Sequence, residues 1–140
     1  MTALDKITMR VNLHGDPDVA ETPRPLLTLE AFFEGNDVVG SIGRNLETPP
    51  EPAAFYALLL RIRKKKSVAD VRVQVTAFDN PDWPFSDTVW IITSEAPEEV
   101  STWFPEHLKP DDCWWGWTDG QSYEEIEMPP DMEPIACRWG

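Results

Sequence analysis

The amino-acid sequence predicts an α+β fold, with a mostly antiparallel sheet of about six strands and two helices packed against it. Two stretches, 7–13 and 71–77, alternate between apolar and polar residues as half-buried strands do. A third stretch, 88–93, is apolar on both faces, which is typical of a central strand. The expected element order, β-β-β-α-β-β-α-β, contains no repeating βαβ unit that would favour a parallel sheet. We expect residues 1–140 to form a single domain.

The first expected strand spans residues 7–13. Its apolar side chains share one face, namely Ile7, Met9, Val11 and Leu13. The segment 14–25 that follows contains one glycine and three prolines, so it is predicted to be an exposed loop.

A hairpin is expected next in the chain. Residues 26–33 form its first strand, 34–37 supply the turn, and 38–42 begin the returning strand. Gly40 and Gly43 indicate a bulge or a close backbone approach, such as a helix laid across the sheet.

The first expected helix spans residues 48–65. Thr48 has the chemistry of an N-cap, Pro49 suits the first helical position, and Glu51 completes a capping box. The basic residues of 61–66 lie at the end of the helix where its dipole favours cations. One apolar stripe follows helical spacing and consists of Phe55, Leu58, Leu59 and Ile62.

The remaining elements complete the sheet and add a second helix. The strands 71–77 and 88–93 are followed by a short helix at 94–104, which Pro105 ends. A last short strand is expected at 135–139.

Composition indicates a folded, soluble protein of the cytoplasm. Apolar residues make up 41% of the chain, no apolar run is long enough to span a membrane, and the N-terminus lacks the pattern of a secretion signal. Cys113 and Cys137 lack CxxC spacing, so reduced thiols are the default, although a single bridge between them stays open.

Charge is distributed unevenly along the chain. The net charge is −13, yet residues 1–78 carry ten acidic and ten basic residues. Residues 79–140 carry fifteen acidic residues, only two basic residues and all seven tryptophans. This asymmetry predicts a polarised surface.

Several kinds of site are not predicted. The glycines of 40–45 match no phosphate-binding loop, and an acidic domain repels nucleic acid despite the basic run 61–66. Neither of two loose clusters has metal-ligand spacing: His107, Asp111, Asp112 and Cys113, and His14, Asp16 and Asp18. Cys113 has no recognisable catalytic partner. We therefore assign no catalytic residue, no metal and no cofactor.

The residues that packing explains least are tryptophans flanked by acids. Large aromatic rings beside carboxylates are typical of anchors for Arg and Lys, and they also suit a sugar or a quaternary ammonium. Some of these rings are expected in the core. The candidate binding residues are Trp83, Phe85, Asp111, Asp112, Trp114, Trp115, Trp117 and Asp119.

Two function classes fit this segment. The first is a non-catalytic module whose acidic, Trp-rich surface binds a basic protein partner, with toxin neutralisation as its most concrete form. The second is a small-ligand-binding protein or enzyme with its site near 114–117. A deep pocket lined by these tryptophans favours the second class, and a flat or convex acidic surface favours the first. The sequence predicts no oligomeric state.

Two stretches, 35–46 and 82–93, resemble a family of small uncharacterised bacterial proteins. The resemblance covers about a sixth of the chain, implies a bacterial cytosolic origin, and transfers no catalytic residue. In size and acidity the chain is also similar to immunity proteins that neutralise bacterial toxins, a similarity of type that no motif carries.

Overall fold

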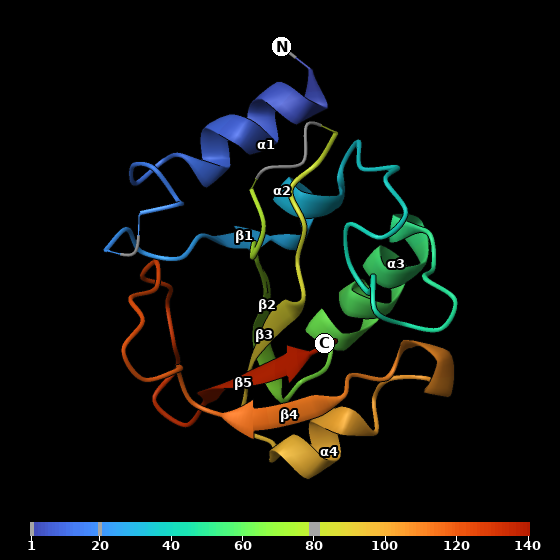
Figure 1. Ribbon diagram of the computed structural model, residues 1–140. Coiled ribbons are helices and arrows are strands. Elements are labelled where there is room, and N and C mark those ends of the chain that lie inside the picture. Colours follow the sequence, from blue (N-terminus) through green and yellow to red (C-terminus); the bar gives the residue numbers. More distant parts are fainter. Residues whose placement is uncertain (1, 20, 79–81) are drawn as a thin grey trace.

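The computed structural model describes residues 2–19, 21–78 and 82–140 (Figure 1). Its sheet has five strands in the order β1-β2-β3-β5-β4, and every neighbouring pair is antiparallel. The α+β class and the antiparallel sheet are thus confirmed, with one strand fewer than expected. The strands are β1 Leu26–Thr28, β2 Val68–Gln74, β3 Thr88–Thr93, β4 Asp112–Trp115 and β5 Glu133–Arg138.

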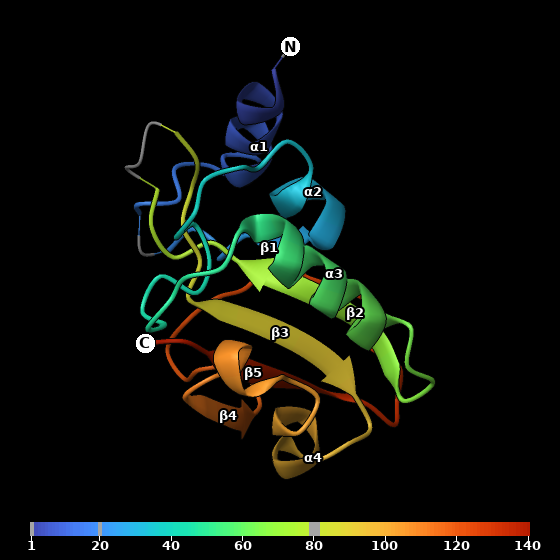
Figure 2. The same ribbon diagram turned by 90° about the vertical axis from the view of Figure 1, so that its right-hand side faces the viewer.

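The described helices are α1 Ala3–Val11, α2 Leu29–Phe33, α3 Pro52–Arg63 and α4 Pro97–Ser101, and a 3-10 turn spans Glu106–Leu108. The helices α2, α3 and α4 cover one face of this sheet, and α1 packs beside α2 at the end of the sheet, as Figure 2 shows. The strand residues beneath them are fully buried, and we call their surface the helix-covered face: Val71, Val73, Val89, Ile91 and Ile135. No described helix has both the length and the apolar composition needed to cross a bilayer.

The strand β3 lies at the centre of the sheet, as its sequence predicts. All six of its residues are buried, and it pairs with β2 on one side and β5 on the other. Trp90, for example, is the partner of Arg72 in β2 and of Ala136 in β5. The apolar residues on both faces of β3 therefore correctly predicted that both faces are buried.

The strand predicted at 7–13 is wrong, because these residues belong to α1 and its C-terminal turn. Thr2 and Asp5 form a capping box that starts the helix. Ile7 and Val11, which are four residues apart, point into the core, whereas Met9 and Leu13 are exposed. The alternating pattern of 7–13 also contains the spacing i, i+4 of a helix. The capping box at Thr2 and Asp5 favours the helix over the strand.

The hairpin predicted at 26–42 is also wrong beyond its first three residues. Thr28 ends β1 and caps α2, because its Oγ1 accepts a hydrogen bond from the Ala31 amide at 3.0 Å. Residues 38–42 contain only an isolated bridge, between Ile42 and Ser86. The close approach predicted at Gly43 is present, since a Cβ there would lie 2.6 Å from Phe55 of α3.

The helix α3 begins three residues later than its sequence signal suggested, at Pro52 rather than Pro49. Its N-cap is Glu51, which makes no side-chain capping bond, and the N-cap predicted at Thr48 is therefore wrong. A helix that began at Pro49 would need an amide hydrogen at Pro52, which proline lacks, whereas Pro52 suits the first helical position. The apolar stripe from Phe55 to Ile62 packs into the core as predicted.

The C-terminal half differs from expectation mainly at β4. No strand was predicted at this edge, whereas β2 and β5 lie near their predicted positions, 71–77 and 135–139. The helix predicted at 94–104 is present as the shorter α4. The long connection 116–132, which we call the covering segment, joins β4 to β5 and lies across the second face of the sheet (Figure 1).

Candidate functional site

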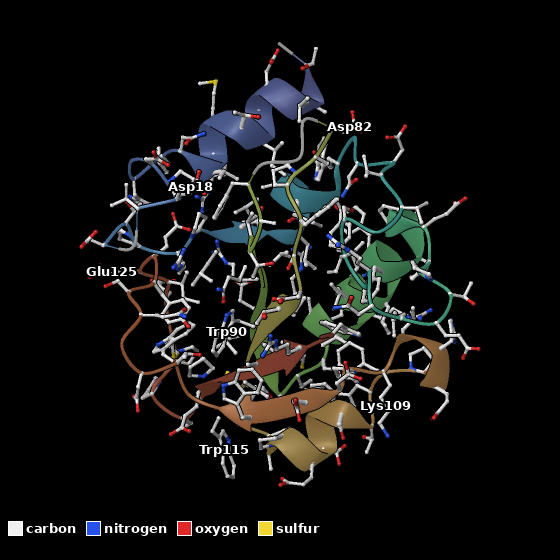
Figure 3. The ribbon with its side chains drawn as sticks, in the orientation of Figure 1. Asp18, Asp82, Trp90, Lys109, Trp115 and Glu125 are labelled. Carbon is white, nitrogen blue, oxygen red and sulfur yellow. The ribbon has the colours of Figure 1, made fainter. Side chains whose placement is uncertain are left out.

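The second face of the sheet carries an aromatic cluster beneath the covering segment. We call this surface the loop-covered face. Figure 3 shows Trp90 projecting from β3 toward the side where Glu125 lies. The cluster consists of buried Leu26, Trp90 and Ala136 with half-buried Trp114, Trp117, Tyr123 and Ile126.

Trp90 is the centre of this cluster and is only 1% exposed. The centre of the Trp117 ring lies 4.6 Å from that of Trp90, and the centre of the Tyr123 ring lies 5.5 Å away in an edge-to-face arrangement. Trp114 makes an edge-to-face contact at 6.4 Å. Such pairs add to the free energy gained by burial, so these rings hold the covering segment on the sheet.

A hollow of about 300 Å³ opens beside the cluster. Aromatic side chains from β3, β4 and the covering segment line it, together with a set of polar groups. These polar residues are Gln74, Thr76, Asp87, Thr88, Thr118, Gln121 and Arg138. The volume is at the small end of the range for ligand sites.

The predicted binding tryptophans occupy three different environments. Trp83 is 3% exposed and its indole N–H donates to the Phe32 carbonyl at 3.0 Å, so this ring belongs to the core and offers no surface. Trp114 and Trp117 are half-buried in the aromatic cluster. Trp115 alone among the tryptophans of 114–117 projects into solvent and is 57% exposed.

The other predicted site residues lie at the surface or close to it. Phe85 is half-buried, with the Arg44 guanidinium 5.6 Å from its ring centre. Asp111, Asp112 and Asp119 are exposed, and Asp111 accepts a hydrogen bond from the Gly140 amide at 2.8 Å. The structure thus brings Asp112 and Trp115 onto one strand but leaves Trp83 and Phe85 elsewhere.

Exposed carboxylates are abundant in the C-terminal half. Ten of them between residues 98 and 133 take part in no ion pair within the described chain. Lys109 is the single basic residue of that range. The ten are Glu98, Glu99, Glu106, Asp111, Asp112, Asp119, Glu125, Glu127, Asp131 and Glu133.

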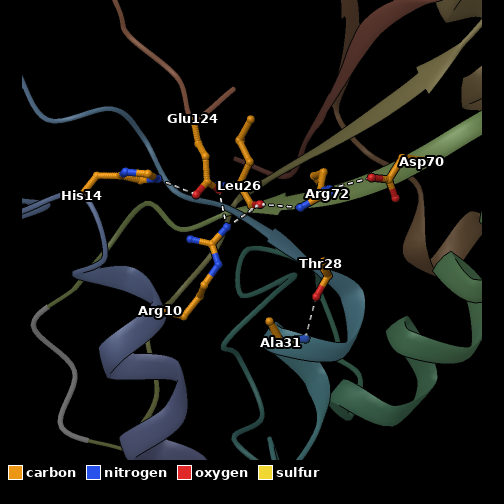
Figure 4. Close-up of polar contacts among 8 residues, drawn as sticks. All are labelled: Arg10, His14, Leu26, Thr28, Ala31, Asp70, Arg72 and Glu124. Carbon is orange, nitrogen blue, oxygen red and sulfur yellow. Dashed lines mark hydrogen bonds and ion pairs between the residues drawn. The ribbon is translucent and has the colours of Figure 1, made fainter. Parts of the chain in front are cut away.

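Glu124 is the exception among these acids, because its carboxylate is only 10% exposed and ties the covering segment to α1 and β1 (Figure 4). Oε1 accepts hydrogen bonds from Arg10 and from the Leu26 amide at 3.1 Å. Oε2 accepts one from His14 Nε2 at 2.7 Å. Three segments that lie far apart in the sequence therefore meet at one carboxylate.

The pKa of Glu124 reflects two opposing effects. Burial of the carboxylate raises its pKa, but the hydrogen bonds from Arg10, His14 and the Leu26 amide together outweigh burial. The pKa of Glu124 therefore lies below its ordinary value. The ionised form of this residue is the one that holds the segment.

The two cysteines are direct partners across β4 and β5. Their Sγ atoms lie 3.7 Å apart, and both are free thiols. The contact with Cys137 lowers the pKa of Cys113, whereas burial raises the pKa of Cys137 well above its usual value. Cys137 is inert core, and only Cys113 reaches the surface in part.

The two histidine clusters of the sequence are separate in space. His14 contacts Glu124, and His107 is exposed in the 3-10 turn. Among residues 2–19, 21–78 and 82–140, no group of three or more His, Cys, Asp or Glu side chains has an arrangement that could hold a metal ion.

Several site residues were missed by reasoning from the sequence. The alternation of 71–77 did place Arg72 and Gln74 on the face opposite the valines, and the two-sided apolar β3 implied a second buried surface. Both signals indicated a second surface of the sheet, on which Gln74 and Trp90 line the hollow. Tyr123 and Glu124 lie in a polar stretch without periodicity, where no pattern marks them.

Comparison with known proteins supports the resemblance stated for residues 35–46 and 82–93. The model of the family described as "Uncharacterized protein YfbO family" matches residues 2–137. The chain is also 46% identical over 139 residues to "Uncharacterized protein YfbO" of Escherichia coli (strain K12), covering 99% of each chain. No solved structure matches the chain. The resemblance to a small bacterial family is thus confirmed.

Proposed function

The chain belongs to the YfbO family, and we propose that it is a non-catalytic protein-binding module whose acidic surface engages a basic protein partner. The observation that carries this proposal is the set of ten exposed carboxylates between residues 98 and 133 that have no ion-pair partner in the described chain. A field of one sign accelerates encounter with a partner of the opposite sign.

Trp115 supplies the apolar contact that such a surface needs. Its side chain is 57% exposed on the edge strand β4 and projects outward at the foot of the molecule in Figure 3. Asp112 lies on the same edge strand, although side chains alternate along a strand and the two therefore point to opposite faces of β4. Exposed tryptophans that become desolvated in a complex are typical binding hot spots.

The packed tryptophans narrow the surface that was inferred from the sequence. Most of the surface of Trp83, Trp114 and Trp117 is buried. The proposed interface therefore contains one exposed tryptophan, Trp115, together with the exposed acids. The most concrete form of the proposal is an inhibitor that neutralises a basic toxin in the bacterial cytoplasm. An immunity-type protein needs a high association rate, which the acidic field supplies.

The test measures binding kinetics with a basic partner isolated from the native cell. We expect the association rate to fall as salt is added, because the field is screened over about 10 Å at 0.1 M salt. Replacing Asp111, Asp112 and Asp119 together with Asn should slow association. The Trp115→Ala change should instead speed dissociation, by roughly thirtyfold if it removes about 2 kcal/mol.

A matched control neutralises three exposed acids in the N-terminal half, through Asp37→Asn, Glu47→Gln and Glu51→Gln. This variant changes the net charge by the same amount and should retain more of the parental association rate. If the first triple variant and Trp115→Ala both bind with parental rates at every salt concentration, the acidic surface is not the interface.

A further inference from the structure

The hollow on the loop-covered face is separate from the surface that carries Trp115. It lies between the sheet and the covering segment and has aromatic walls from Trp90, Trp114 and Tyr123. Trp115 does not line it. A ligand in this hollow would therefore use groups that the proposed protein interface leaves free.

Gln74 supplies the most informative polar group in the hollow. The residue is 92% buried, since its exposed fraction is 8%. Its Oε1 accepts a hydrogen bond from the Trp90 indole at 2.8 Å, which fixes the orientation of the amide. The Nε2 group has no hydrogen-bond partner in the described chain, and Gln74 lines the hollow. The buried side-chain atom without a partner in the described chain is Arg10 Nη1, so Gln74 Nε2 reaches solvent and can donate to water or to an oxygen of a ligand.

The lining of the hollow offers further hydrogen-bonding groups. Arg138 is half-exposed, and its Nε lies 3.9 Å from Asp87 Oδ2. Thr88 donates its hydroxyl proton to Asp87 Oδ1 at 2.7 Å. Gln121 accepts a hydrogen bond from the Tyr123 hydroxyl at 3.1 Å, which leaves its own amide group free to donate. Hydrogen-bond donors and acceptors thus lie beside the aromatic walls of the hollow.

This combination suits a ligand that has an apolar face and a rim of oxygens. A pyranose sugar has such a shape, because its C–H face packs on aromatic rings and its hydroxyls both donate and accept. A volume of about 300 Å³ is enough for one sugar unit and leaves room for water.

Charge decides between neutral and ionised sugars. Arg138 and Asp87 have opposite charges and lie close together, so the pair adds no net charge. The whole chain has a net charge of −13, which repels an anionic ligand. A cationic ligand would be placed beside Arg138. We propose that the hollow binds a neutral pyranose, either as a free monosaccharide or as the terminal unit of a glycan.

The experiment uses the intact chain labelled with nitrogen-15. Each of D-glucose, D-galactose, D-mannose and N-acetyl-D-glucosamine is added to about 10 mM, well above a millimolar Kd. We expect at least one of them to shift the indole N–H signal of Trp90, which Gln74 holds, and to show saturation transfer from the protein. A short oligosaccharide that ends in the same unit distinguishes a glycan end from a free sugar by binding more tightly.

Two variants link binding to the hollow. Gln74→Glu keeps an acceptor for the Trp90 indole but removes the donor, so we expect the Kd to rise about tenfold or more. Arg138→Ala changes a side chain that is half-exposed, so it tests the site without threatening the fold, and it should raise the Kd by about threefold to tenfold. Arg61→Ala, on the exposed side of α3, is the matched control and should leave the Kd unchanged.

Three results would overturn the proposal. They are the absence of any sugar-dependent shift, binding of glucuronate or glucosamine only, and binding that neither Gln74→Glu nor Arg138→Ala weakens. The proposed protein interface is tested separately, through the association and dissociation rates of the Trp115 and Asp111, Asp112 and Asp119 variants with a protein partner. Either proposal can therefore fail while the other stands.

Discussion

The helix-covered face and the loop-covered face of the sheet differ in how their covers are held. On the first, α2, α3 and α4 bury a continuous apolar core that includes Val71, Val73 and Ile91 (Figure 2). On the second, an irregular segment packs through a few aromatic rings and through the carboxylate of Glu124 (Figure 4). The helices are held by apolar burial over a wide area, whereas the covering segment is held by a small number of specific contacts.

This difference separates the part of the molecule that stabilises the fold from the parts that carry the proposed binding surfaces. Apolar burial over a wide area contributes most of the free energy of folding, so the helix-covered face defines the fold. Regions with few buried apolar contacts open locally at a lower free energy. Both proposed binding surfaces involve strand β4 or the covering segment, which lie outside the main core.

The largest expected effect comes from placing a charge on the helix-covered face. Ile91 is fully buried there, so Ile91→Asp should lower the free energy of unfolding by more than about 4 kcal/mol. Urea unfolding followed by circular dichroism measures this change. Val39→Asp, at a side chain that is 55% exposed, should remain within about 0.5 kcal/mol of the parent.

An Ile91→Asp protein that unfolds at the parental urea concentration would show that β3 is not the centre of the sheet. The comparison between the two faces would then lose its basis.

A smaller effect is expected at the contact that holds the covering segment. Glu124→Gln weakens the hydrogen bonds to Arg10 and His14, which should cost about 2 to 3 kcal/mol. Glu125→Gln changes the same charge at an exposed neighbour and is the control, with an expected cost near zero. Equal unfolding free energies for the two variants would contradict the role given to Glu124.

The same contact predicts a dependence on pH. Because the folded pKa of Glu124 is below its ordinary value of 4.5, the stability it adds is complete above pH 4.5. That stability is lost as the pH falls through the folded pKa. Unfolding free energies measured from pH 6 downward should therefore decline less steeply for Glu124→Gln than for the parent, and parallel curves would refute this.

The smallest effect separates two adjacent tryptophans on β4. Trp114 contacts Trp90 in the aromatic cluster of the loop-covered face, so Trp114→Ala should cost about 2 kcal/mol or more. Trp115 is largely exposed, and its replacement by Ala should cost less than about 0.5 kcal/mol. Thermal melts of the two variants test this order, and a reversed order would contradict the packed position of Trp114 and the exposed position of Trp115.

The helix-covered face was the easier one to predict from the sequence. The two-sided apolar pattern of β3 identified the central strand, and the stripe of α3 identified its buried side. Patterns failed where two periods overlapped in a short segment, as at Ile7 and Val11. A local cap then decided the outcome, as Thr2 did for α1 and Thr28 for α2.

The loop-covered face was harder to predict because its contacts are distant in sequence. Glu124 contacts Arg10, His14 and Leu26, which lie about a hundred residues earlier in the chain. No local pattern records such a contact. The tryptophans of 114–117 were recognised as unusual, but only the register of β4 against β5 shows that Trp114 packs and Trp115 is exposed.

Hydrogen exchange at two amides tests the central difference most directly. The Ile91 amide lies in the middle of the sheet, and the Glu124 amide donates to the Arg24 carbonyl at 3.0 Å, a bond that exists only while the cover is docked. We predict that the Glu124 amide exchanges through a local opening at least about 2 kcal/mol below the opening free energy of Ile91, which should approach the global value. Equal opening free energies at the two amides would mean that the cover leaves only when the whole sheet unfolds, and would contradict the account.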